Sequence, residues 1–143
     1  MLTKTVRSGE SERFGGDRKL LLVEDNADDL ELTTGALKRA GFAVESAGSK
    51  REALEKFGSG EFSLVVTDRE IPFVEGQSPT KKAGDSLSRE LKGLEKPPTV
   101  IMHTGTPPTF AEQSFIRADS YVNKESACGA LLSELRRRTL ETA

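Results

Sequence analysis

The sequence predicts an α/β domain, a three-layer sandwich in which helices cover both faces of a parallel sheet. Short apolar runs alternate along the chain with stretches of helical periodicity, and this alternation indicates right-handed crossovers between parallel strands. The run at residues 64–66, Leu-Val-Val, is continuous rather than alternating, as in strands that are buried on both faces. Several of the runs end abruptly on a polar side chain, which places these side chains at one edge of the sheet.

Five segments are expected to be strands. Residues 19–23 (Lys-Leu-Leu-Leu-Val) and 64–66 are apolar enough to be buried strands. Residues 42–47 are less apolar, which predicts a strand at the edge of the sheet. Residues 98–104 form the fourth strand, and the short run 120–123 forms the fifth.

The helices between these strands are predicted from apolar periodicity and from signals at their ends. The first helix covers residues 27–40 and ends at Gly41. The second opens with a capping-box pattern at residues 49–52 and stops at Gly58. The last helix is expected to be capped by Ser126.

The two remaining helices follow the third and fourth strands. Residues 77–84 are polar and rich in turn formers, so we expect a surface loop there. Leu87, Leu91 and Leu94 then line one face of a helix. A second capping box at residues 109–112 opens a short helix after the fourth strand.

Length and composition restrict the function. The 143 residues suffice for one domain with its own core, and a net charge of −2 gives no support for binding DNA or an anionic membrane. No apolar run approaches membrane-spanning length. Cys128 is the single cysteine, so a reducing, cytoplasmic compartment is expected. Residues 1–18 are polar and lack apolar periodicity, which predicts a flexible leader before a domain at residues 19–140.

Polar side chains stand at the same edge of the predicted sheet, where each strand ends. They are Glu24 and Asp25 after the first strand, Asp68 after the third, Thr104 at the end of the fourth and Lys124 after the fifth. An isolated aspartate at a strand end is usually a loop or capping residue. Ligand sites of open parallel sheets, however, lie beyond the carboxyl ends of the strands. Because several strands share this feature, a functional site is favoured.

These residues belong to motifs that resemble one known family. Residues 23–25 (Val-Glu-Asp) resemble its acidic pair, and residues 68–76 (Asp-Arg-Glu-Ile-Pro-Phe-Val-Glu-Gly) resemble its phosphoacceptor with the following proline and glycine. Residues 100–105 (Val-Ile-Met-His-Thr-Gly) resemble its switch-threonine strand. Residues 118–124 (Ala-Asp-Ser-Tyr-Val-Asn-Lys) resemble the strand with its switch aromatic residue and lysine. In this order the motifs resemble the receiver domains of two-component response regulators, over residues 19–138.

The resemblance implies a flavodoxin-like, doubly wound fold with a five-stranded parallel sheet of order 2-1-3-4-5. In that order the ends of the first and third strands are neighbours, so Glu24, Asp25 and Asp68 are expected to converge. Three carboxylates repel one another unless a cation lies among them, and hard oxygen ligands suit Mg²⁺. By the resemblance, the backbone carbonyl of Glu70 completes the protein ligands of the metal.

The resemblance also implies a function in a phosphorelay. Asp68 is expected to accept a phosphoryl group from a histidine kinase or a histidine phosphotransfer protein, and the domain itself is expected to catalyse its phosphorylation and dephosphorylation. Lys124 and the Thr104 hydroxyl are expected to bind phosphoryl oxygens. Tyr121 is expected to enter the space that Thr104 vacates, which switches a protein-interaction surface. No effector sequence follows Arg138, so we expect a stand-alone regulator that acts on a downstream protein partner, with self-association left open.

Departures from the family pattern give further expectations. Lys124 is followed by Glu125 rather than by proline, so we expect a trans peptide bond there. The segment after the third strand is longer than usual, and either Gly76 or Gly84 serves as the loop glycine of the family. The carboxylate of Glu70 lies within reach of Lys124 and is expected to pair with it in the metal-free protein.

Two other functional classes do not fit the same residues. A flavin-binding protein of this fold needs hydroxyls and amides after the first strand, where this chain has the acidic residues 24–29. A haloacid-type hydrolase needs its nucleophile after the first strand and a second aspartate two residues later, whereas Asp68 follows the third strand and is followed by Glu70. The alternative that stays open is a pseudo-receiver, a protein-interaction module that acts without phosphorylation.

Overall fold

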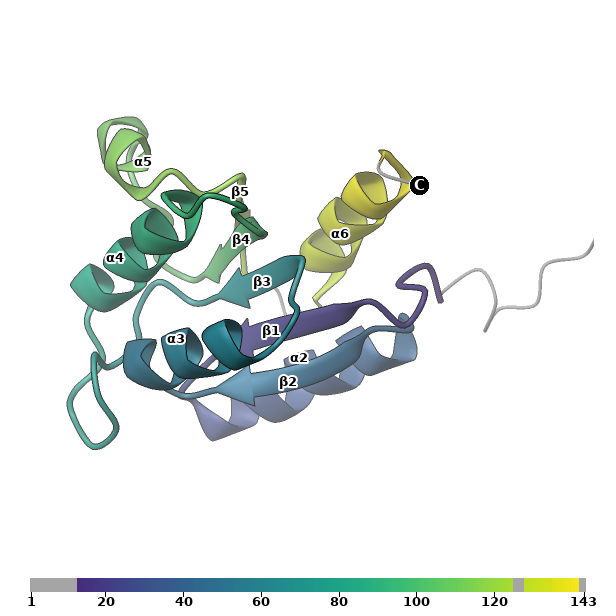
Figure 1. Ribbon diagram of the computed structural model, residues 1–143, viewed down its shortest axis with the longest axis horizontal. Coiled ribbons are helices and arrows are strands. Elements are labelled where there is room, and N and C mark those ends of the chain that lie inside the picture. The colour runs from purple at the N-terminus through teal and green to yellow at the C-terminus, as the bar shows by residue number, and fades with distance from the viewer. Residues whose placement is uncertain (1–12, 125–127, 142–143) are drawn as a thin grey trace, which may run out of the picture.

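The computed structural model describes residues 13–124 and 128–141, and its five strands form one parallel sheet (Figure 1). The strands pair in the order β2-β1-β3-β4-β5, which confirms the predicted fold and strand order. β2 lies at one edge, as its weaker apolar character predicts. The strand bounds are Lys19–Val23 for β1, Ala43–Ala47 for β2, Leu64–Thr67 for β3, Thr99–Thr104 for β4 and Ser120–Asn123 for β5.

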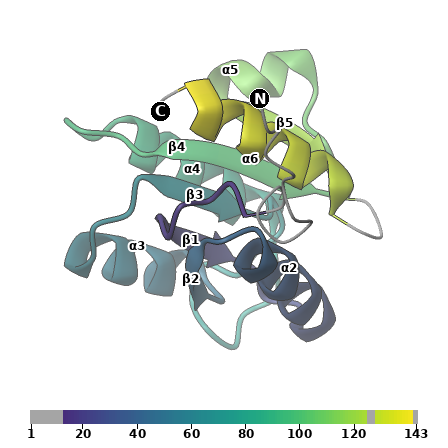
Figure 2. The same ribbon diagram turned by 90° about the vertical axis from the view of Figure 1, so that its right-hand side faces the viewer.

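Helices cover both faces of the sheet (Figures 1 and 2). Their bounds are Ala27–Arg39 for α2, Lys50–Ser59 for α3, Lys81–Lys92 for α4, Phe110–Ile116 for α5 and Gly129–Glu141 for α6. Leu37 of α2 and Leu135 of α6 are fully buried against one face, whereas Leu87 and Leu91 of α4 pack with Ala53 of α3 against the other. α5 lies beside α4. Within the described residues, no helix is both long enough and apolar enough to cross a membrane.

The two predicted capping boxes are confirmed to different degrees, one fully and one in part. The capping box of α5 is complete. At α3 the Ser49 hydroxyl accepts the N–H of Glu52, but the Glu52 carboxylate accepts the N–H of Gly48, so the box is only half formed. The predicted end at Gly58 is wrong, because α3 continues to Ser59. A glycine in a helix costs only about 1 kcal/mol, which the surrounding turns tolerate.

Residues 81–84, predicted to be loop, are instead the first turn of α4. The Thr80 hydroxyl caps this turn by accepting the N–H of Lys82. Thr80 also pairs with Ile71 in an antiparallel bridge, with N–H to carbonyl distances of 2.9 and 3.4 Å. This bridge closes the loop, so the helix begins directly after it. Leu94 lies beyond α4 and is 45% exposed, which corrects its predicted place on the buried face.

Gly84 and Gly76, the two candidates for the loop glycine, have different roles in the structure. Gly76 has φ +88° with no atom within 4 Å of a built Cβ, so it serves a left-handed turn. A Cβ on Gly84 would lie 2.0 Å from the carbonyl oxygen of Arg69. Gly84 therefore lets α4 contact the main chain directly after Asp68.

Residues 13–18, the described part of the predicted leader, pack against the domain. The ring of Phe14 meets that of Phe42 edge-on, with the ring centroids 5.6 Å apart. The N–H of Gly15 donates to the carbonyl oxygen of Ala40 at 2.8 Å. The packed chain therefore begins before β1. Ser126 and the peptide bond between Lys124 and Glu125 lie outside the described residues.

Replacing Gly84 by alanine should destabilise the domain by roughly 1–3 kcal/mol or more, because the new methyl group overlaps the Arg69 carbonyl. The matched control is Gly58→Ala, which also lies in a helix but has nothing within 4 Å of the new Cβ. It should be neutral or stabilising by up to about 1 kcal/mol. Urea unfolding at one pH measures both changes. Similar unfolding midpoints for the two variants would contradict the proposed backbone contact.

Candidate functional site

The ammonium group of Lys124 lies among three carboxylates at the carboxyl edge of the sheet. Its Nζ donates to Oε1 of Glu24 at 2.8 Å, to Oδ2 of Asp29 at 2.8 Å and to Oδ2 of Asp68 at 2.9 Å. Glu24 follows β1, Asp29 lies in the first turn of α2, and Asp68 follows β3. The parallel strand order thus brings together residues that are far apart in the sequence.

The carboxylate of Asp68 has a fixed orientation because both of its oxygens accept hydrogen bonds. Oδ1 accepts the N–H of Arg69 at 2.6 Å and that of Glu70 at 3.3 Å, while Oδ2 faces Lys124. The Asp68 side chain is 11% exposed. It is therefore held in place at the sheet edge yet still reaches the solvent.

Glu24 is the buried member of the acidic group, with 4% of its surface exposed. Its Oε2 accepts the N–H of Asn26 at 3.2 Å, and its Oε1 faces Lys124. Burial raises the pKa of Glu24 to about 7, and the charge of Asp68 adds to this effect, although the Lys124 hydrogen bond opposes it. The carboxylate is thus costly to ionise in this position.

Asp25 follows Glu24 and is largely exposed. The part of its carboxyl group that is buried raises its pKa, and the charge of Asp68 raises it further.

The pKa of Lys124 shifts in the direction expected for a paired ammonium. Burial alone would lower it, but the hydrogen bonds to Asp29, Glu24 and Asp68 outweigh burial and raise it. Lys124 therefore stays protonated at neutral pH.

Thr104, at the end of β4, is hydrogen-bonded to Thr106 instead of to the acidic group. Its Oγ1 accepts the N–H of Thr106 at 3.1 Å and lies 3.2 Å from the Thr106 hydroxyl oxygen. The Thr106 hydroxyl donates its single hydrogen to Oε1 of Glu70 at 2.9 Å. In the hydroxyl pair it therefore accepts, and Thr104 donates.

This arrangement corrects the expected pairing of Glu70 with Lys124. The Glu70 carboxylate is engaged by Thr106, and Lys124 is engaged by carboxylates from β1, α2 and β3. Three carboxylates already accept hydrogen bonds from the lysine, so a fourth carboxylate would gain little by pairing with it.

Tyr121, the predicted switch residue, is partly buried, and its hydroxyl donates to the carbonyl oxygen of Gln113 in α5 at 3.2 Å.

The contribution of Asp29 was missed from the sequence. The available signal was its position three residues after Asn26, which caps α2 and accepts the Asp29 N–H at 2.9 Å. A side chain in that position of the first turn lies next to the loop after β1. Thr106 carried no signal of its own, because its role depends on how the β4–α5 loop folds.

The oxygen donors at this edge fit Mg²⁺ by their chemistry. Three carboxylates, from Glu24, Asp29 and Asp68, contact a single ammonium, and the charge of Asp25 acts on the same group, so an excess of negative charge remains that a divalent cation would compensate. In the part of the chain that is described, no three histidine, cysteine, aspartate or glutamate side chains are already arranged to hold a metal ion. Glu24 and Asp68 instead turn towards Lys124.

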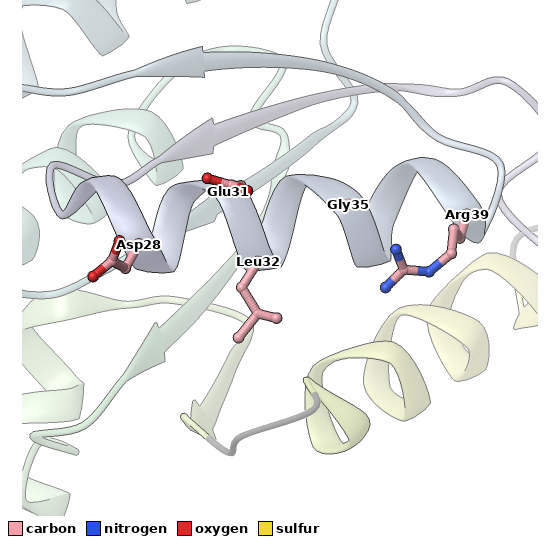
Figure 3. Close-up of a pocket in the computed structure, with 5 residues that line it drawn as sticks. All are labelled: Asp28, Glu31, Leu32, Gly35 and Arg39. Atoms are coloured by element: carbon pink, nitrogen blue, oxygen red, sulfur yellow. The ribbon is translucent and has the colours of Figure 1, made fainter.

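Another surface depression lies on the outer side of α2, lined by Asp28, Glu31, Leu32, Gly35 and Arg39 (Figure 3). All of these residues belong to one helix, and Arg39 folds back over Gly35. None of the predicted site residues lines it. The carboxyl edge of the sheet is therefore the better candidate for chemistry.

Comparison with known proteins gives the family of the chain. The family model described as the response regulator receiver domain matches residues 20–136. The transcriptional regulatory protein CutR of Streptomyces coelicolor is 31% identical over 120 residues, which cover 82% of this chain and 52% of CutR. The chain therefore spans about half the length of this curated relative. A two-component response regulator of Oryza sativa subsp. japonica is 34% identical over 99 residues, which cover 68% of this chain and 69% of the relative.

Two of the similar solved structures contain the response regulator TrrA of Thermotoga maritima. Its complex with Mg²⁺-BeF has a TM-score of 0.70 and 27% identity, and the match covers 84% of this chain and 97% of that chain. Its complex with the histidine kinase ThkA gives a TM-score of 0.69 and 26% identity, with 86% and 98% covered.

The substitution Glu24→Gln should stabilise the metal-free protein more at pH 8 than at pH 5. The wild-type carboxyl has its pKa raised from 4.5 to about 7, so stability is lost as the pH rises through this range. The variant has no group to ionise and should gain on the order of 2 kcal/mol at pH 8. Urea unfolding with a chelator present measures this gain, with Glu45→Gln as a control at an exposed position. A gain that is equal at both pH values would show that burial of the charge is not its cause.

Proposed function

Because the chain belongs to the family of response regulator receiver domains, we propose that Asp68 accepts a phosphoryl group and thereby switches a protein-interaction surface. The observation that carries the proposal is the contact of Lys124 with Asp68, Glu24 and Asp29. A lysine that neutralises a fixed aspartate at the carboxyl edge of a parallel sheet has the charge and the position to receive a phosphoryl group.

The phosphoryl donor in this proposal is a phosphohistidine of a histidine kinase or a histidine phosphotransfer protein. An oxygen of Asp68 forms a bond to phosphorus while the phosphorus–nitrogen bond of the donor breaks, and the freed imidazole takes up a proton. The fixed orientation of the Asp68 carboxylate favours this attack, because two backbone N–H groups and Lys124 hold it in place. The kinase complex of TrrA supports a partner of this kind.

Lys124 has a second part in the proposal. Its ammonium is protonated at neutral pH, so it can donate to a phosphoryl oxygen after the transfer in place of the Asp68 carboxylate. The Thr104 hydroxyl would exchange its hydrogen bond with Thr106 for one to another phosphoryl oxygen. Tyr121 would follow Thr104 and change its contact with α5.

Mg²⁺ is the cofactor of the proposed reaction. Glu24, Asp25, Asp68 and the backbone carbonyl of Glu70 would hold it. When bound, it neutralises negative charge on the transferring phosphoryl group. The excess of carboxylates over ammonium groups supports this, as does the Mg²⁺-BeF complex of TrrA.

The proposal includes a cytoplasmic location and a downstream protein partner. A single free, buried cysteine suits a reducing compartment. A role in binding DNA or a membrane is not part of the proposal, since the net charge is only −2.

Incubation with acetyl phosphate should add one phosphoryl group to the wild-type protein, and only when Mg²⁺ is present. The variant Asp68→Asn should gain none, because its amide is a poor nucleophile. Intact-mass spectrometry measures both results. An unchanged adduct in the variant, or none in the wild type with Mg²⁺, would favour the pseudo-receiver instead.

A further inference from the structure

Arg69, the residue directly after Asp68, has a buried guanidinium group that joins three other segments. Its side chain is 3% exposed, and its Nε and Nη2 donate to the two carboxylate oxygens of Asp85 in α4 at 2.8 and 3.1 Å. Nη2 also donates to Oε2 of Glu112 in α5 at 2.9 Å. Nη1 donates to the carbonyl oxygen of Thr106 at 3.2 Å. The side chain therefore connects α4, α5 and the loop between β4 and α5.

The main chain of Arg69 is held on both sides as well. Its N–H donates to Oδ1 of Asp68, and its carbonyl lies against Gly84 of α4 so closely that a Cβ there would be 2.0 Å away. Interiors packed this densely transmit a displacement because there is little free space to absorb it. A change at Asp68 that alters the hydrogen bond to Arg69 is thus passed to the Arg69 side chain.

Glu112 is the partner of Arg69 on α5. Its Oε1 accepts the N–H of Thr109 at 2.8 Å, and its Oε2 accepts from Arg69. The hydrogen bond from the Thr109 backbone and that from Arg69 lower the pKa of Glu112 to about 2, so its carboxylate is ionised at neutral pH. The first turn of α5 is therefore attached to the residue next to Asp68 by an ion pair, in addition to the covalent chain.

The rest of α5 is held by side chains from β5 and α4. The Tyr121 hydroxyl donates to the carbonyl oxygen of Gln113, and Nη1 of Arg89 donates to the carbonyl oxygen of Phe115 at 2.9 Å. Arg89 also stacks on the Phe115 ring, with the guanidinium carbon 4.7 Å from the ring centroid. Of these two arginine side chains that contact α5, Arg69 directly follows Asp68 and Arg89 lies in α4.

We propose that Arg69 is a positioning residue that transmits the state of Asp68 to α5 through its ion pair with Glu112. The inference rests on the proposed phosphorylation of Asp68 and adds a route by which it reaches the first turn of α5. A phosphoryl group adds negative charge and new acceptor oxygens next to the Arg69 N–H. The hydrogen bond from this N–H to Oδ1 of Asp68 then changes its length or its acceptor. Because one guanidinium holds both Glu112 and the Thr106 carbonyl, the helix and the loop move together.

The test uses Glu112→Gln, because Arg69 itself is buried and its replacement would leave Asp85 without its partner. Glu112 is half exposed, and glutamine keeps one acceptor oxygen for the Thr109 N–H while losing the charge that pairs with Arg69. Beryllofluoride with Mg²⁺ serves as the phosphoryl mimic, and fluorine NMR reports its occupancy. Hydrogen exchange of residues 110–116, with and without the saturating mimic, reports the response of α5.

In the wild type the mimic should change the exchange rate of residues 110–116. In Glu112→Gln the mimic should still bind, but the change in exchange rate should fall by about fivefold or more, the lower end of typical couplings between sites. Arg89→Gln is the matched control, since it removes an arginine contact to α5 and leaves the contact between Arg69 and Glu112 in place. Its response to the mimic should equal that of the wild type, even where its basal exchange is faster.

The outcomes separate the two proposals. If the wild type binds no beryllofluoride, the proposed function fails and the inference fails with it. If the mimic binds and the response of α5 is the same in Glu112→Gln as in the wild type, only the role of Arg69 is overturned. An equal loss of response in Arg89→Gln would also overturn it, because any loosening of α5 would then suffice.

Discussion

The contact of one ammonium with three carboxylates is the interaction on which the site depends. Lys124 follows β5, at one edge of the sheet, and it binds Asp68 after β3 and Glu24 after β1. A parallel sheet with the strands in this order places their carboxyl ends at one edge, within reach of a single side chain. The same lysine binds Asp29 in the first turn of α2, so the start of this helix is also held at the Lys124 ammonium.

The acidic group also shows how the fold supports a site that is unfavourable by itself. Burial raises the pKa of Glu24, and the charge of Asp68 raises it further, so ionising both groups costs stability. Strongly perturbed carboxyl groups of this kind are typical of functional sites. The apolar strands compensate for the cost, because β1 and β3 are almost completely buried on both faces.

The sequence predicted the sheet well because its strands are apolar runs that end on polar residues, a pattern that depends on the chain alone. It also placed Glu24, Asp68 and Lys124 at one edge. It did not reveal that Arg69 is a buried ion-pair partner, because charged residues after a strand are usually exposed. It also missed the start of α4, which depends on the bridge between Ile71 and Thr80 across the loop.

Among Glu24, Asp25, Asp29 and Asp68, we propose that Asp68 alone carries the phosphoryl group. Borohydride reduces an acyl phosphate, but not a free carboxylate, to an alcohol, so a phosphorylated aspartate becomes homoserine. After incubation with a phosphodonor and Mg²⁺, reduction and peptide sequencing by mass spectrometry should find homoserine at position 68 and an unmodified carboxylate at Glu24, Asp25 and Asp29. Homoserine at Asp25 or Asp29, or no homoserine anywhere in the protein, would contradict the account.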